Sequence, residues 1–397
     1  VLFRSPGLTL KSGASGDLVF RGRTPEGLEV IRTYHFKSGS YAFDLKTQVI
    51  NHTSQTIEGE LKLALTGKVR GNGQEAQGFI ISANHSIEEF KADKVREPKT
   101  FATKVNWAGL DELYFMAVAV PQTSPRLQVT LAEPQPQQLR ATLSLPGAIP
   151  PGQDTQAQYT LYFGPKESSH LAAVGLGLEN VINFGWFDWL ARPCLWFLKW
   201  LNSWVGNYGW SLIILTIILR LIFWWPNHKS FKSMKVMQKI QPRVAEIREK
   251  FKDDREAMNR ELMNLYRTFK VNPLGGCLPM VLQLPVFIAL YNILSTAIEL
   301  RHAHFINTIP FTNLVWLADL SAKDPLLITP LVMGASMFVQ QKMSPSMGDP
   351  TQAKMMMFLP LIFTFLFLNF ASGLVIYWLV NNILAIIQQH YTNKYLQ

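Results

Sequence analysis

Polar and apolar residues alternate with a period of two in short segments throughout the first 170 residues. Gly, Ser, Asn and Pro turn residues separate these segments, the clearest of which are 17–23, 28–36, 41–50, 57–65, 127–145 and 156–163. Such alternation at roughly ten-residue spacing is typical of antiparallel strands that bury one face. We therefore predict an all-β sandwich domain over 1–170.

The predicted β-domain shows no pattern of catalytic or metal-ligating residues. His35, His52 and His85 are far apart in the sequence, which is typical of scattered surface histidines. Carboxylates such as Glu58 alternate with apolar residues and indicate a solvated sheet face. A sandwich is compatible with a groove for sugar or peptide, but no residue pattern points to one.

Long apolar segments appear only after residue 208. Five could span a membrane: 210–225, 274–298, 325–339, 355–370 and 372–387. The second has 25 residues without a charge, which is hard to explain in a soluble protein. The last three have 15 or 16 residues, fewer than the roughly 20 that a transmembrane helix needs. The sequence predicts a membrane domain of five transmembrane helices over 208–397.

An aromatic segment precedes these spans. Residues 183–204 hold five Trp and three Phe, together with three charged residues and Pro193. Aromatic rings are most favourable at the boundary between water and lipid, whereas the charges and the proline disfavour a span. We predict a linker and an amphipathic helix in the interface plane over 171–207, with a buried core helix as the alternative.

Charge is concentrated in one part of the chain. Of 38 basic and 28 acidic residues, 12 basic and 6 acidic residues lie in 227–272. Because basic loops remain in the cytoplasm, the β-domain is expected on the opposite, extracytoplasmic side. Helical periodicity over 234–251 and 258–269 predicts a hairpin of two amphipathic helices. Its basic face could meet anionic lipid, ribosomal RNA or acidic proteins, and a merely solvated surface is the alternative; we expect no DNA partner.

Cofactor chemistry is not indicated. Cys194 and Cys277 are the only cysteines and lie in apolar surroundings, so neither a disulfide framework nor a cysteine zinc site is expected. The sequence contains no phosphate-binding G-x-x-x-x-G-K-[ST] motif. We expect no cofactor, no metal and no catalytic residues.

Arg220 is the most informative single residue. It lies inside the first apolar segment, one helical turn after Thr216. A guanidinium in hydrocarbon costs from about 2.5 to more than 10 kcal/mol, so Arg220 is expected to line a hydrated interior. The alternative is that it extends toward the cytoplasmic head groups. Neither 274–298 nor 355–387 offers a carboxylate partner, so an unpaired cation would attract an acidic segment.

Several motifs resemble one family. They are N-P-L-G-G-C-L-P-M at 272–280, L-P-V-F-I-A-L-Y at 284–291, Q-K-M-S-P at 341–345, S-G-L-V-I-Y-W at 372–378 and I-I-Q-Q at 386–389. Together with Arg220 they resemble the YidC/Oxa-type membrane protein insertases, in the same order over 182–397. The β-domain resembles, less specifically, the β-supersandwich periplasmic domain of family members from double-membraned bacteria.

The resemblance implies an insertase and chaperone for newly made inner-membrane proteins, acting alone or with the Sec translocon. In this family five spans enclose a hydrophilic groove open to the cytoplasm and to lipid, and Arg220 and Thr216 match its polar positions. The resemblance also implies an apolar slide for the client helix, for which the candidates are Phe287, Met333, Leu366, Tyr377 and Trp378.

The implied partners are nascent membrane proteins, the lipid bilayer, the Sec translocon, and a ribosome or targeting receptor at the hairpin. An accessory structural subunit of the translocon is the alternative function. A transporter is disfavoured because the spans 274–298 and 355–387 lack coupling carboxylates.

Two departures from the family pattern stand out. The sequence begins at Val1 without Met or a leader, so we expect a fragment that lacks the family's first span. Only Lys394 is basic after the last span, so a ribosome-binding tail is expected to be absent or removed.

Overall fold

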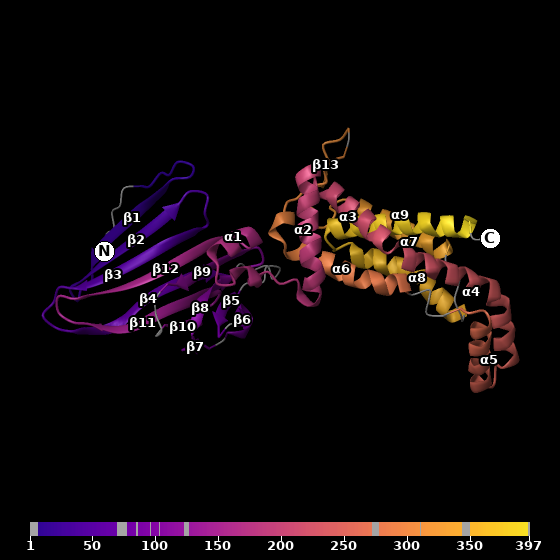
Figure 1. Ribbon diagram of the computed structural model, residues 1–397, viewed down its shortest axis with the longest axis horizontal. Coiled ribbons are helices and arrows are strands. Elements are labelled where there is room, and N and C mark those ends of the chain that lie inside the picture. The colour runs from indigo at the N-terminus through magenta and orange to yellow at the C-terminus, as the bar shows by residue number, and fades with distance from the viewer. Residues whose placement is uncertain are drawn as a thin grey trace. The chain divides into compact units, whose positions relative to one another are not determined.

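The computed structural model describes residues 7–69, 78–84, 86–95, 97–102, 104–122, 127–271, 278–309, 311–343 and 350–395. The chain forms two compact units, Val1–Asn183 and Phe184–Gln397. The first is built mainly from strands and the second from helices, as Figure 1 shows. Residues 272–277, 344 and 345, which belong to the family-like motifs, lie outside the described residues.

The β-domain contains two antiparallel sheets. The larger has the order β1-β2-β3-β12-β9-β8-β5-β6, and its strands are Ser15–Arg23, Leu28–Lys37, Ala42–Asn51, Asp154–Pro165, Phe115–Pro121, Val105–Asp111, Gly78–Ala83 and Ser86–Lys91. The smaller has the order β4-β11-β10-β7, with strands Ile57–Lys68, Gln138–Ile149, Gln128–Gln135 and Lys99–Phe101. The predicted all-β domain is confirmed.

The core lies on both faces of the larger sheet. Phe79 and Ile81 of β5 belong to the apolar core shared with the smaller sheet, whereas Ile80 points to the opposite face. On that face, α1 (Ser168–Val174) and the short helix η2 (Leu178–Val181) cover Trp107. Residues 171–183 are therefore part of the β-unit rather than the start of a linker, because their apolar side chains complete its second core.

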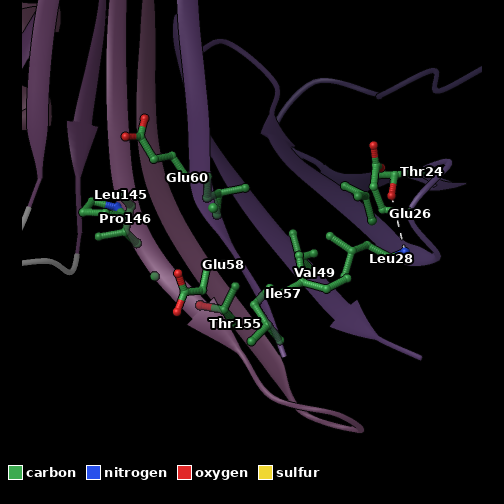
Figure 2. A pocket seen from close by; sticks show the side chains of 15 residues that line it. Thr24, Glu26, Leu28, Val49, Ile57, Glu58, Glu60, Leu145, Pro146 and Thr155 are labelled. Atoms are coloured by element: carbon green, nitrogen blue, oxygen red, sulfur yellow. Dashed lines mark hydrogen bonds between the residues drawn. The ribbon is translucent and has the colours of Figure 1, made fainter. Parts of the chain in front are cut away.

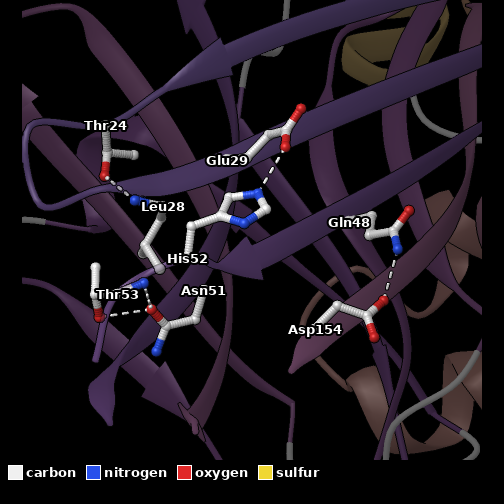
Figure 3. Close-up of polar contacts among 8 residues, drawn as sticks. All are labelled: Thr24, Leu28, Glu29, Gln48, Asn51, His52, Thr53 and Asp154. Carbon is white, nitrogen blue, oxygen red and sulfur yellow. Dashed lines mark hydrogen bonds and ion pairs between the residues drawn. The ribbon is translucent and has the colours of Figure 1, made fainter. Parts of the chain in front are cut away.

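A buried asparagine closes one end of the sandwich. The Asn51 side-chain amide donates to the carbonyl oxygens of Ile149 (2.7 Å) and Gln55 (2.8 Å). The Thr53 backbone N–H donates in turn to Asn51 Oδ1, and His52 contacts Glu29 nearby (Figure 3). These bonds hold the crossing where the chain passes from β3 in one sheet to β4 in the other.

The membrane unit has helices at all five predicted span positions. Its helices are α2 (Asp188–Val205), α3 (Tyr208–Ile222), α4 (Trp224–Lys250), α5 (Arg255–Thr268), α6 (Leu278–Thr296), α7 (Ile328–Met343), α8 (Pro350–Phe367) and α9 (Ser372–Tyr395). A short hairpin of β13 (Ile306–Thr308) and β14 (Val315–Leu317) lies between α6 and α7. Helix α9 is central, because it packs against α3, α4, α6 and α7.

The helices differ in how well they could cross a bilayer alone. Among the described residues, Leu278–Thr296 and Ser372–Thr392 are long and apolar enough, and α3 with α4 forms a third candidate that bends by 63°. Met357–Phe367 is a shorter apolar segment. The expectation of a short last span is wrong: α9 has 24 residues, about 36 Å at 1.5 Å per residue, because the helix continues past its apolar residues.

Helices α4 and α5 form the predicted hairpin. Met237, Ile240 and Val244 of α4 pack against Leu262 of α5, along the apolar stripe that the sequence shows. Asp254 begins α5 by accepting a hydrogen bond from the Ala257 backbone N–H at 2.9 Å. The basic residues are left on the outside of this small core.

Candidate functional site

Arg220 lies in the last turn of α3 and faces the bundle interior. Its side chain is buried, with 7% of the residue exposed. Its Nε and Nη2 atoms are buried and have no hydrogen-bond partner among the described residues. An arginine that extended to the head groups would be exposed, so this geometry favours the inward orientation. Because buried donors without partners are costly, the site requires water or a ligand group at these nitrogens.

Tyr377 of α9 lies across the α3–α9 interface from Arg220. Its side chain is buried, its hydroxyl has no hydrogen-bond partner in the described part of the chain, and it is close enough to Arg220 to interact electrostatically. Thr216 is also buried, but its hydroxyl donates to the Leu212 carbonyl of its own helix at 2.7 Å. The α3–α9 interface thus brings Arg220 and Tyr377 together, and Thr216 does not pair with either of them.

Phe287 and Trp378 meet in an aromatic cluster that joins three helices. Their ring centroids are 5.1 Å apart with an edge-to-face angle of 86°. Phe363 and Phe367 of α8 contact the same indole, at 6.0 and 5.4 Å. The Trp378 Nε1 donor is buried without a partner among the described residues. The cluster therefore combines a large apolar surface with one unsatisfied polar atom.

The two remaining slide candidates have different environments. Met333 of α7 is 0% exposed, so contact with a client would require α7 to separate from its neighbours. Leu366 of α8 is 52% exposed, and other exposed apolar side chains share this helix: Met357, Phe358, Leu361, Ile362 and Phe365. Three of them, Met357, Phe358 and Leu361, line an open groove of about 420 Å³ between α7 and α8, whose other lining residues are mainly apolar.

Sequence reasoning missed two groups of residues. Phe363 and Phe367 were not singled out, although their four-residue spacing on an apolar helix places both on one face. Gln388 and Gln389 were noted only as part of a motif. Gln388 donates to the Trp224 carbonyl at 3.0 Å and Gln389 to the Met343 carbonyl at 2.8 Å. They tie the beginning of α4 and the end of α7 to α9.

Helix α2 has the properties expected at a lipid interface. Figure 1 shows it running across the direction shared by α3, α6 and α9. Trp196 is 67% and Trp204 77% exposed, which disfavours a buried core helix. Lys199 forms an ion pair with Glu299 at 2.9 Å and fixes α2 to the loop after α6. The exposed indoles are therefore held on a fixed surface of the membrane unit.

Comparisons with known proteins cover both units. A family model described as YidC periplasmic domain matches residues 3–197, and one described as 60Kd inner membrane protein matches residues 200–397. The chain is 45% identical over 396 residues to a protein of Syntrophus aciditrophicus, covering 98% of this chain and 71% of the relative. It is 46% identical over 398 residues to one of Geotalea uraniireducens, covering 99% and 74%. Both relatives are named membrane protein insertase YidC.

One similar solved structure is an active YidC insertase with its first transmembrane domain resolved, at 21% identity and a TM-score of 0.45, covering 94% of this chain and 76% of that chain. The family matches and the relatives confirm the resemblance seen in the motifs. They also confirm an inner-membrane location with the N-terminal domain in the periplasm. The chain belongs to the YidC family of membrane protein insertases.

Proposed function

We propose that the chain inserts newly synthesised proteins into the inner membrane, and assists their folding, through a hydrated interior around Arg220. The observation that carries this proposal is the buried guanidinium whose Nε and Nη2 lack protein partners. A structural helix contact would pair these donors or replace the arginine by an apolar residue. A site that receives a polar client segment needs hydrogen-bond donors that are not already paired within the protein.

The physical task is to carry a polar end of the client across hydrocarbon. Each unsatisfied polar group there costs several kcal/mol. Water around Arg220 keeps the polar end solvated for part of the way, and the cation attracts acidic ends in particular. This lowers the barrier without covalent chemistry, so the proposal includes neither a catalytic residue nor a cofactor.

The apolar part of the client leaves sideways into lipid. About 25 cal/mol is gained for each Å² of apolar surface removed from water. The cluster of Phe287, Phe367 and Trp378 and the exposed apolar face of α8 offer a surface for this step. We assign the slide to this cluster and to Leu366, with Met333 as a packing residue that becomes accessible only if α7 moves.

The partners on the cytoplasmic side belong to the same proposal. The α4–α5 hairpin presents basic residues around a small apolar core, which suits a ribosome or a targeting receptor. Cooperation with the Sec translocon would extend the range of clients. A purely accessory role is disfavoured, because the relatives are named insertases.

Two neighbouring positions on α3 provide the test. Thr216 is buried and Ile217 is 38% exposed, so they sample the interior and the surface of the same helix. A photocrosslinking residue at position 216 should capture a stalled client with an acidic end more strongly than one at position 217. Purified protein alone in liposomes should also insert a small client. Equal crosslinking at both positions, or no insertion without a translocon, would contradict the proposal.

A further inference from the structure

The β-domain contains a cleft that a pair of glycines creates. Gly59 of β4 and Gly147 of β11 lie opposite each other in the smaller sheet, between the pairs Ile57–Ile149 and Leu61–Leu145. These apolar pairs are partly or fully buried, and the glycines interrupt the row. A Cβ atom at either glycine would meet nothing within 4 Å. Two side chains are therefore missing from an otherwise continuous apolar face.

The opposite wall comes from the larger sheet. Leu28, Val30 and Val49 line the same cleft, whose volume is about 510 Å³. Figure 2 shows Leu28, Val49 and Ile57 around it. The hydrogen bonds from Asn51 to Ile149 and Gln55 hold the two sheets together at this end. The cleft thus has a fixed end and apolar walls, which suits a ligand that enters as a chain.

Strand β4 adds a second feature. It is the edge strand of the smaller sheet, since β11 is its only strand neighbour among the described residues. An edge strand leaves alternate backbone N–H and C=O groups free to pair with an added strand. An extended peptide on β4 would place every second side chain toward the space above Gly59 and Gly147.

Charge at the cleft restricts the occupant. Glu26, Glu58 and Glu60 belong to its lining, and Lys62 is the partner of Glu60 at 3.0 Å. On an added strand, basic side chains opposite these carboxylates would be favourable and acidic ones unfavourable. Translocated client segments are poor in Lys and Arg, so the carboxylates disfavour a client as the occupant.

We propose that the cleft at Gly59 and Gly147 binds an extended segment of a periplasmic partner subunit, with apolar residues alternating with Lys or Arg, by strand addition to β4. Apolar side chains would fill the cleft, and basic ones would face Glu58 and Glu60. Such a site would hold the insertase beside a partner without using the membrane interior.

The test uses the full chain in detergent and a fluorescent heptapeptide, Lys-Val-Lys-Ile-Lys-Val-Lys, with blocked ends. Fluorescence anisotropy should show saturable binding above that to empty micelles. Gly147→Val puts a side chain into the cleft where a Cβ atom would meet nothing within 4 Å, and it should weaken binding at least tenfold while the protein stays folded. Gly7→Val is the matched control, because Gly7 also has open space at its Cβ position and does not line the cleft.

Two further measurements test the role of the carboxylates and the addition of a strand to β4. Glu58→Lys should weaken binding of the basic peptide at least threefold. It should strengthen binding of the acidic peptide Glu-Val-Glu-Ile-Glu-Val-Glu. Hydrogen exchange should slow at amides of 57–61 when the basic peptide binds. The proposal is overturned if Gly147→Val binds like the unchanged protein, if the acidic peptide binds better to the unchanged protein, or if β4 gains no protection.

Discussion

Replacing Arg220 should change function and stability in opposite directions: insertion should slow, and the free energy of unfolding should rise. Arg220→Met keeps a long apolar side chain but removes the cation and the two unpartnered donors. At 4 Å, a guanidinium attracts a carboxylate by about 1 kcal/mol in water and about 4 kcal/mol at an effective dielectric constant of 20. If this attraction is lost from the rate-limiting state, insertion of a client with an acidic end should slow by about 5-fold to about 900-fold. Arg220→Lys should retain most of the rate, because the attraction needs only a positive charge.

Stability should change in the other direction. A buried charge without an ion-pair partner carries a desolvation cost even where water bonds to its donors, so Arg220→Met should raise the free energy of unfolding by about 1–3 kcal/mol. The assays are protease protection of a client inserted into liposomes and thermal unfolding of the same preparations. A client with a neutral translocated end is the control and should lose little. The reasoning is refuted if both clients slow equally, or if Arg220→Met unfolds at a lower temperature than the unchanged protein.

Three other predictions concern separate parts of the chain. Burial raises the pKa of the Asp111 carboxyl to about 6 although Lys166 donates to it at 3.1 Å. Because the native state then binds more protons than the unfolded chain, the free energy of unfolding should fall by on the order of 3 kcal/mol as the pH rises from about 4 to about 6. Asp111→Asn should remove this slope in urea titrations followed by circular dichroism, and an unchanged slope would count against it. Buried Asp324 accepts from the backbone N–H and the hydroxyl of Thr329, both at 2.8 Å, at the beginning of α7. Asp324→Ala should therefore destabilise the membrane unit by more than about 1 kcal/mol, measured by thermal unfolding, and no change would contradict this role. A fluorophore on Trp196→Cys in nanodiscs should be quenched most by lipids spin-labelled near the head group, whereas quenching only by aqueous iodide would contradict an interfacial α2.

The sequence alone determined the division into a β-half and a membrane half. Alternation with a period of two is a property of the strands themselves, and it predicted most of the larger strands within a few residues. Apolar composition placed the five spans, and the basic residues of 227–272 set the orientation. Local motifs were sufficient for the family, because several occur in order. The aromatic segment 183–204 likewise predicted α2 before any packing was known.

The tertiary structure decided which surfaces meet. Periodicity shows that a helix has an apolar face but not which element covers it, so the proximity of Arg220 to Tyr377 became visible only from the packing of α3 on α9. For the same reason the sequence does not show that residues 171–183 complete the β-domain core. The opposition of Gly59 and Gly147 depends on the register between β4 and β11, which are separated by some 70 residues in sequence. Strand register and helix packing are long-range properties, and single-sequence patterns carry information only about neighbours along the chain.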